Sequence, residues 1–307
     1  MAYYNIEVRP NMNGDLGILG KFQTPARIES ELHQEFFTNF TDEKVLRDTV
    51  VDVLVIGDSF SREGEDAYLN YIAASGMSVM NFYVSSNEYQ TAYDLCNLGF
   101  IDSTNVKTII VENVERELVG LLKAVKVGND SIHKREAYDT SKNYHEESWS
   151  LLEMKNWFLL RLGYEEPVKK CKLSEKLFSG EKGDELYFYD SDLNSFHIEK
   201  NDEKVLLEHL KLVENKCNEK GVNVIFLVCP DKYDMYQDYI IFNPYERKTI
   251  NEDFRLLFPE KSNLVIGKEV LNPLLKHGEK DIYHQNDTHW SWKAAKIVAD
   301  SITKLIR

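Results

Sequence analysis

The segment VDVLVIGDSFS, residues 51–61, constrains the fold of this chain more than any other. Its four consecutive apolar residues at 53–56 predict a strand that is buried on both faces, as in parallel sheets. The run stops at the small polar turn Gly57-Asp58-Ser59. Since open α/β sheets hold their functional groups at the carboxyl ends of strands, we expect Ser59 to present its hydroxyl in a crevice there. Many strands end in such turns, so a catalytic role for Ser59 also requires a base elsewhere in the chain.

Strands and helices alternate along the chain on both sides of a long polar interruption. Apolar residues at helical spacing predict helices between the strands, the first closing at Gly76 and the last running to residue 306. This rhythm is typical of an α/β fold with a doubly wound, mostly parallel five-stranded sheet. The five strands are predicted at 51–57, 77–84, 106–114, 222–230 and 263–267.

The polar interruption determines the domain organisation that we predict. Residues 1–45 form an N-terminal extension, and residues 46–307 form an α/β domain with an α-rich insertion at about 126–200. Within the insertion, residues 145–164 have the apolar spacing of an amphipathic helix, and residues 185–192 alternate like an exposed strand. We expect the insertion to pack over the sheet, with its aromatic side chains in a core rather than on a ligand-binding platform.

Composition and charge exclude several classes of function. With 307 residues, of which 43% are hydrophobic, the chain can bury a sizeable core. The formal net charge of -14 opposes a general affinity for nucleic acid or an anionic bilayer, whereas a weakly charged glycan is readily accommodated. No apolar run approaches the roughly 18 to 20 residues of a membrane helix. The first ten residues also lack the pattern of a signal peptide, so we expect no direct membrane insertion of this chain.

The sequence predicts neither a metal nor an organic cofactor. It contains no Gly-rich phosphate loop and no HExxH motif, and its four cysteines lack the spacing of a zinc site or a disulfide framework. His284 lies close to His289, but their spacing fits no common metal site. We expect Cys217 and Cys229 to be small core residues.

The loop before the terminal helix carries Asp287-Thr288-His289. An imidazole that acts as a base needs a carboxylate on its other ring nitrogen, and an aspartate two residues away can supply it. If the fold brings this loop to Ser59, the chain holds a complete Ser/His/Asp set. The structural alternative is that Asp287 or Thr288 caps the terminal helix and that His289 only packs or lies at the surface.

These motifs together resemble those of a known superfamily. GDSFS at 57–61, followed much later by DTHW at 287–290, is similar to the SGNH hydrolases. The Asp-x-His spacing resembles in particular their polysaccharide O-acetyltransferase branch, the alginate O-acetyltransferase-like proteins, because ordinary SGNH esterases more often carry Asp-x-x-His. CPDKYDMY at 229–236 is similar to the Pro-x-Lys…Tyr segment of that branch, and IIVENVER at 109–116 to its strand ending in Glu-x-x-Glu-Arg. The resemblance covers most of residues 50–306 and leaves the insertion unmatched.

The resemblance implies a three-layer, flavodoxin-like fold and a serine-dependent O-acetyltransferase. It implies Ser59 as nucleophile, His289 as base and Asp287 as the group that orients the base, with an acetyl-serine intermediate passed to a sugar hydroxyl. Arg116 is implied near the substrate or the oxyanion, although a salt bridge to Glu112 or another carboxylate is an alternative. The resemblance likewise implies Lys232 near the substrate or the oxyanion. The alternative is a structural role, in which the aliphatic part of the lysine side chain covers the edge of the sheet.

The sequence also departs from the superfamily pattern. Where SGNH hydrolases place an oxyanion glycine after the second strand, this chain has the Ser85–Asn87 region, which makes Ser86 and Asn87 further candidates for oxyanion or substrate contact. Asn87 is alternatively the N-cap of the following helix. VENVER replaces the Gly-x-Asn-Asp block. In alginate-type proteins the Asp-x-His motif usually precedes the serine, whereas here it follows.

These departures leave three functions open. The first is an O-acetyltransferase that acts on a polysaccharide or oligosaccharide acceptor beside a membrane-bound O-acyltransferase. The second is an SGNH carbohydrate esterase that uses water as acceptor. The third is a catalytically silent glycan-binding protein. The resemblance implies an extracytoplasmic protein, periplasmic or at the cell surface, whereas a chain without a signal peptide is equally compatible with the cytoplasm.

Overall fold

The computed structural model describes residues 16, 40–42, 51–61, 67–83, 87–128 and 167–306. In this part of the chain, a six-stranded sheet has the order β1-β3-β2-β4-β7-β8, and a separate two-stranded sheet pairs β5 with β6. All neighbours in the large sheet are parallel. Its strands are β1 (Phe40–Asp42), β2 (Val53–Gly57), β3 (Val79–Tyr83), β4 (Thr108–Val114), β7 (Asn223–Cys229) and β8 (Leu264–Ile266).

The predicted α/β fold class is confirmed, and all five predicted strands are present. The sequence missed β1, whose three residues pair with β3 from Phe40 opposite Val79. Residue 16 also contacts the rest of the protein, because the Leu16 N–H donates to the Asn286 carbonyl at 3.3 Å. The segment predicted as an N-terminal extension therefore supplies both an edge strand and a contact to the loop before the last helix.

The strand order places a topological switch point beside β2. From β2 the chain first crosses to β3 on one side and then returns to β4 on the other side. Consecutive crossovers in opposite directions leave a crevice at the carboxyl ends of the strands where they diverge, and such crevices are where open α/β sheets bind ligands. The turn that carries Ser59 follows β2 directly and therefore lies at this point.

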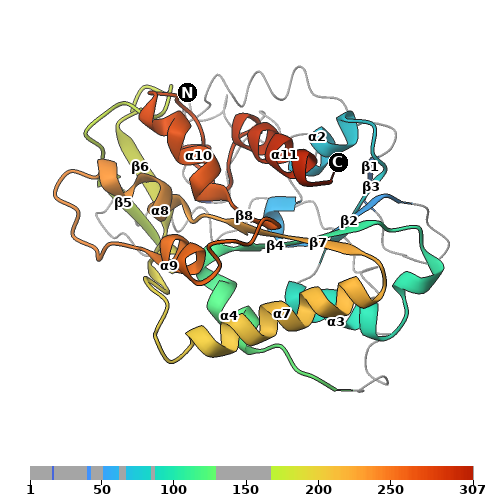
Figure 1. Cartoon of the computed structure of the whole chain (residues 1–307). Coiled ribbons are helices and arrows are strands. Elements are labelled where there is room, and N and C mark those ends of the chain that lie inside the picture. Colours follow the sequence, from blue (N-terminus) through green and yellow to red (C-terminus); the bar gives the residue numbers. More distant parts are fainter. Residues whose placement is uncertain are drawn as a thin grey trace.

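Helices cover both faces of the large sheet (Figure 1). One layer contains α2 (Tyr68–Ala74), α10 (Gly267–Lys276) and α11 (Trp292–Ile306), and the other contains α3 (Glu88–Asn97), α4 (Leu118–Lys123) and α7 (Glu203–Glu219). Alternate residues of each strand serve the two layers, so that Val53 and Val55 join one core and Leu54 and Ile56 the other. Burial on both faces explains the consecutive apolar residues at 53–56 in β2 and at 109–111 in β4.

The described part of the predicted insertion is a β-hairpin. Strand β5 (Val168–Lys172) pairs antiparallel with β6 (Glu185–Tyr189), and the helix predicted at 145–164 lies outside the described residues. The strand predicted at 185–192 is present as β6, but its predicted exposure was wrong, because Leu186, Tyr187 and Phe188 are all buried. Phe188 packs against Tyr233, whose centroid is 5.2 Å away, so both faces of β6 are covered. The last residues of that segment form a 3-10 turn, η7 (Asp190–Leu193), rather than strand.

Two predictions about single elements are also tested by the fold. Cys217 and Cys229 are fully buried, as expected of small core residues. No helix among the described residues has the length and apolar character needed to cross a membrane.

Candidate active site

The turn after β2 is braced by the side chain of Asp58. The chain passes from Gly57 into a short 3-10 helix, η3 (Ser59–Ser61). Asp58 Oδ1 accepts from the Phe60 N–H at 2.9 Å, and Asp58 Oδ2 accepts from the Val114 N–H at the end of β4, at 2.8 Å. These bonds fix the turn against the neighbouring strand and leave Ser59 exposed. The Ser59 N–H lies at the start of η3, where a helix has no internal acceptor for it.

The loop before α11 reaches this turn from the other end of the chain. Ser59 Oγ lies 2.8 Å from His289 Nε2, and His289 Nδ1 lies 2.7 Å from Asp287 Oδ1. Asp287 Oδ1 also accepts from the His289 N–H at 3.0 Å, which fixes the carboxylate against the backbone of the residue that it orients. The structure thus brings Ser59, His289 and Asp287 into one hydrogen-bonded chain, the arrangement that activates serine hydroxyls.

The alternative that Asp287 or Thr288 caps the terminal helix does not fit the geometry. Helix α11 begins at Trp292, so the residue before it is Ser291. Ser291 Oγ donates to the Asp281 carbonyl, and its own carbonyl accepts from the Ala295 N–H. The Asp287 carboxylate instead contacts the backbone N–H and the ring Nδ1 of His289.

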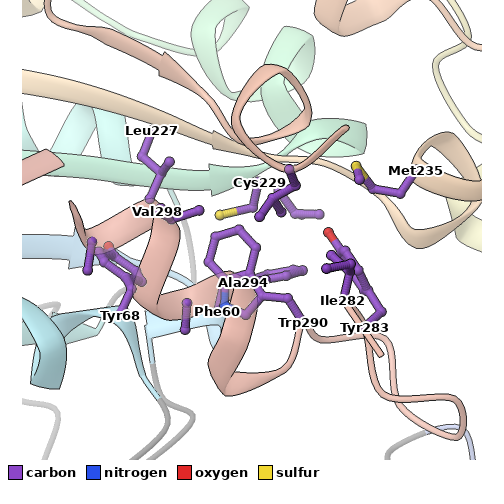
Figure 2. Packing of buried hydrophobic residues seen from close by; sticks show 14 of the residues in the cluster. Phe60, Tyr68, Leu227, Cys229, Met235, Ile282, Tyr283, Trp290, Ala294 and Val298 are labelled. Carbon is purple, nitrogen blue, oxygen red and sulfur yellow. The ribbon is translucent and has the colours of Figure 1, made fainter. Parts of the chain in front are cut away.

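An aromatic side chain of the core packs against the His289 imidazole. The Phe60 ring lies edge-on to the His289 ring, with centroids 4.9 Å apart, and edge-on to Trp290 at the same distance. Figure 2 shows Phe60 and Trp290 packed in the hydrophobic core, together with Cys229 of β7 and Ala294 of α11. Tyr283 and Trp290 also form an isolated antiparallel bridge that closes the loop carrying Asp287 and His289. The loop therefore has a rigid base.

A buried glutamate, Glu112, lies under the serine turn. Glu112 of β4 is fully buried, and its Oε2 accepts from the Asp58 N–H at 3.2 Å. Burial, together with the negative charge of Asp58, raises the pKa of Glu112 well above its ordinary value, which favours the protonated form of this carboxyl group. A Cβ at Gly57 would lie 2.2 Å from Glu112 Oε2, so any larger residue at this position would force the Glu112 carboxyl group to shift. An ionisable residue inside the otherwise apolar strand is the sequence signal that could have identified it.

Arg116 forms the salt bridge that was its structural alternative, but its partners are not Glu112. Its Nη1 lies 2.5 Å from Asp231 Oδ1 and 3.4 Å from Asp192 Oδ1. Burial opposes the charge, yet these two carboxylates raise the pKa of Arg116 above its ordinary value. The side chain stays 21% exposed, at the carboxyl end of β4.

Lys232 is buried behind the loop rather than exposed at the sheet edge. Its Nζ donates to the backbone carbonyls of His284 at 2.7 Å, Gln285 at 2.8 Å and Asp287 at 2.9 Å. The side chain is 1% exposed. Lys232 therefore contacts the backbone of the loop that carries His289. Of its two predicted roles, this geometry fits the structural one.

The two remaining candidates are Asn87 and Ser86. Asn87 is the N-cap of α3, because its Oδ1 accepts from the Gln90 N–H at 2.8 Å, and its Nδ2 donates to the Leu121 carbonyl. Both ends of the amide are thereby used to hold helices. Ser86 lies outside the described residues.

No group of three or more His, Cys, Asp or Glu that could hold a metal ion occurs among the described residues. His284, which is adjacent to the site in sequence, uses its backbone for the loop: its N–H donates to the His289 carbonyl at 3.2 Å. The backbone of His284 thus supports the residue that contacts Ser59.

Fold and site together define an α/β domain with a serine, a histidine and an aspartate in contact at the carboxyl edge of its parallel sheet. Residues 184–307 match the family described as ALGX, an SGNH hydrolase-like domain of the acetyltransferase AlgX. This confirms, over these residues, the resemblance that the motifs predicted. The matched segment contains Asp287 and His289, whereas Ser59 precedes it. A search among curated proteins finds no match to this chain.

Proposed function

We propose that this protein is a serine-dependent O-acetyltransferase that moves an acetyl group onto hydroxyls of a cell-surface polysaccharide. The observation that carries the proposal is the chain of two short contacts from Ser59 Oγ through His289 to Asp287, 2.8 and 2.7 Å long. The match of residues 184–307 to an SGNH hydrolase-like acetyltransferase domain supports the same reaction class.

In the first half-reaction, Ser59 Oγ attacks the carbonyl carbon of the acetyl donor while His289 Nε2 takes the hydroxyl proton. Asp287 stabilises the resulting imidazolium through the Nδ1 contact. The tetrahedral intermediate collapses as the bond to the leaving group breaks, and His289 returns its proton to that group. The Ser59 N–H at the start of η3 is a donor for the oxyanion. The product is an acetyl-serine.

In the second half-reaction, a sugar hydroxyl attacks the acetyl-serine, and His289 accepts its proton and then returns it to Ser59 Oγ. The same steps with water as acceptor give an esterase, which is the second candidate. The acetyl-serine chemistry is identical, so only the acceptor distinguishes the two functions.

The partners and the location follow from the proposed reaction. The acceptor is a polysaccharide or oligosaccharide, and a membrane-bound O-acyltransferase supplies acetyl groups on the same side of the membrane, either periplasmic or at the cell surface. A net charge of -14 suits a neutral acceptor better than an anionic one.

The test uses an activated acetyl ester with and without glycan oligomers, and follows acetylated oligomers by mass spectrometry. We expect acetyl transfer that disappears in Ser59→Ala. Ser75→Ala is the matched control, because Ser75 caps the end of α2 away from the turn. Acetate release at a rate unaffected by any glycan would favour the esterase and contradict the proposal.

A fluorophosphonate that labels serine nucleophiles separates both enzymes from a silent glycan-binding protein. We expect labelling of Ser59 in the wild type and its loss in His289→Ala, because phosphonylation needs the base. A wild-type protein that is folded and stays unlabelled would show that the fold is retained without catalysis.

A further inference from the structure

Three carbonyl groups of the loop before α11 converge on one point. They belong to His284, Gln285 and Asp287, and the Lys232 ammonium occupies that point, at 2.7 to 2.9 Å from each oxygen. An ammonium has three N–H donors, so the three carbonyls match its hydrogen-bonding capacity. Aligned carbonyl dipoles in a buried place repel one another unless a cation separates them. The loop conformation therefore depends on this charge.

The lysine itself is held rigidly. Lys232 is the first residue of α8 (Lys232–Tyr236), directly after Pro230 and Asp231 at the end of β7. The Tyr283 hydroxyl donates to the Pro230 carbonyl at 2.5 Å, and the Tyr283 N–H donates to the Tyr236 hydroxyl at 3.2 Å. Tyr283, at the base of the loop, thereby contacts both the residue at the end of α8 and the segment that precedes α8. Lys232 is thus a fixed anchor rather than a mobile side chain.

We propose that Lys232 is a positioning residue that sets the Asp287 backbone so that its carboxylate meets His289 Nδ1. The proposal rests on the proposed function, because it concerns the same serine, histidine and aspartate. One residue separates the anchored Asp287 carbonyl from the His289 backbone, and the Asp287 carboxylate bonds both the His289 N–H and its ring. Without the ammonium, the loop relaxes, and the carboxylate no longer meets the ring.

The test substitutes Lys232→Met, which keeps the length of the stem and removes the charge. Lys261→Met is the matched control: its ammonium lies 5.4 Å from the Phe226 ring centroid and pairs with Glu214, in the core layer opposite the site. We expect Lys232→Met to be labelled at Ser59 by the fluorophosphonate at least about tenfold more slowly, with the apparent affinity for the reagent little changed. The control should match the wild type.

A proton NMR signal distinguishes positioning from a general loss of stability. The His289 Nδ1–H bonded to a carboxylate resonates far downfield, and we expect this signal to be absent in folded Lys232→Met and present in Lys261→Met. Folded Lys232→Met with both the signal and the wild-type labelling rate would overturn the proposal. Should Lys232→Met fail to fold, Lys232→Arg replaces it, because a planar guanidinium cannot direct its donors at three converging carbonyls. Failure of both variants to fold, or full activity of Lys232→Arg, would also overturn it.

The outcome is separable from that of the proposed function. The downfield signal reports the His289–Asp287 contact whether or not Ser59 reacts. A wild-type protein that shows the signal but no labelling would contradict the proposed function, while the comparison of Lys232→Met with the control would still decide the role of Lys232.

An independent observation concerns the opposite layer of helices. Cys96 near the end of α3 and Cys217 near the end of α7 are both fully buried, and their sulfur atoms lie 3.5 Å apart. A disulfide bond is about 2.05 Å long, so an approach of about 1.5 Å joins them. The contact to Cys217 and the nearby Lys220 lower the pKa of the Cys96 thiol despite its burial, which favours Cys96 as the attacking thiolate.

We infer that Cys96 and Cys217 form a disulfide that links α3 to α7 when the chain folds in the presence of an oxidised disulfide donor. The Cys96 thiolate attacks the donor disulfide and releases one donor thiol. The Cys217 thiolate then displaces the second donor thiol. Two protein thiols are thereby oxidised, and one donor disulfide is reduced to two thiols.

The test refolds the full chain with a glutathione redox couple and maps unreduced peptides by mass spectrometry. We expect peptides containing Cys96 and Cys217 to be linked, and Cys171 and Cys229 to stay alkylatable. Cys171→Ser should leave the linked species unchanged, and Cys96→Ser should abolish it. Four free thiols, or a link between other cysteines, would overturn the inference.

Discussion

Single residues determine whether the serine turn can form, and Gly57 is the most constrained of them. Glu112 fills the space in which a side chain at position 57 would lie. The glycine before Asp58 and Ser59 therefore does more than allow the chain to turn. It also leaves room beneath Ser59 for the buried Glu112, whose Oε2 accepts a hydrogen bond from the Asp58 N–H.

We predict that Gly57→Ala destabilises the protein by about 1–3 kcal/mol, because its Cβ would meet Glu112 Oε2 at 2.2 Å and the crowded turn must move. Ser59 labelling should fall in parallel. Gly120→Ala is the control: Gly120 lies inside α4, and a Cβ at this position would have no neighbouring atom within 4 Å, so alanine should stabilise by about 0.5–1 kcal/mol. Urea unfolding measures both. Equal stability of Gly57→Ala and the wild type would show that the turn is not crowded.

At the residue scale, the sequence predicted Ser59, Asp287 and His289 but not their supports. Short motifs preserve the chemical identity of a side chain, so the base and its carboxylate could be recognised from the Asp-x-His spacing. Glu112 and Lys232 act through space on segments that lie far away along the chain. Lys232 was identified as a candidate, but its three carbonyl partners are 52 to 55 residues distant and follow no sequence rule.

At the scale of elements, the apolar runs predicted the central strands well and the edges poorly. β2, β4 and β7 are buried on both faces, and this burial explains the consecutive apolar residues at 53–56, 109–111 and 224–228. β1 has three residues and pairs with one neighbour, so it needs no comparable run. β6 alternated like an exposed strand, yet aromatic side chains from other elements cover it.

Glu88, in the first turn of α3, is expected to make the stability of the protein depend on pH. Glu88 is 4% exposed, and burial raises its pKa to about 7 from 4.5. The folded protein therefore binds this proton more tightly than the unfolded chain does. The stabilisation is complete below about pH 4.5 and is lost as the pH rises to about 7, a change of at most about 3 kcal/mol.

Glu88→Gln removes the proton exchange at this position. We expect the free energy of unfolding to fall less between pH 5 and about 8 in this variant than in the wild type, because glutamine is neutral throughout. Burial and the charge of Asp231 also raise the pKa of Asp192 to about 7. The free energy of unfolding should therefore still depend on pH in the variant, but less steeply than in the wild type. Denaturant titrations at several pH values measure it. Identical slopes would mean that Glu88 is ionised in the folded state.

At the scale of the whole molecule, a buried ionic cluster joins the hairpin segment to the large sheet. Lys248 Nζ is fully buried, lies 2.5 Å from Asp231 Oδ2 and 3.4 Å from Glu115 Oε1, and donates to the Asp192 carbonyl. Arg116 bridges Asp231 and Asp192 from the exposed side. The cluster connects β4, β7 and the turn after β6, three segments that are distant in sequence.

We predict that Lys248→Met costs about 3–5 kcal/mol, because it removes the cation beside the fully buried Glu115 and leaves only Arg116 to face Asp231 and Asp192. Lys204→Met is the control: Lys204 is 86% exposed and pairs with Glu208 on α7, so its loss should cost less than about 1 kcal/mol. Thermal and urea unfolding of both variants measure the difference. A cost below about 1 kcal/mol for Lys248→Met would show that the carboxylates take up protons or rearrange without penalty.

The sequence by itself determined the α/β class, the central strands and the chemical identity of the serine, histidine and aspartate. Hydrophobic periodicity and short motifs are local properties of the sequence, and they can be recognised without knowing which segments are neighbours in the fold. Only the tertiary structure decided that Ser59 and His289, 230 residues apart, lie 2.8 Å from one another. It also decided that Arg116 faces Asp231, that Lys232 lies behind the loop, and that Cys96 meets Cys217. These pairings depend on strand order and loop closure, which bring together positions that no periodicity connects.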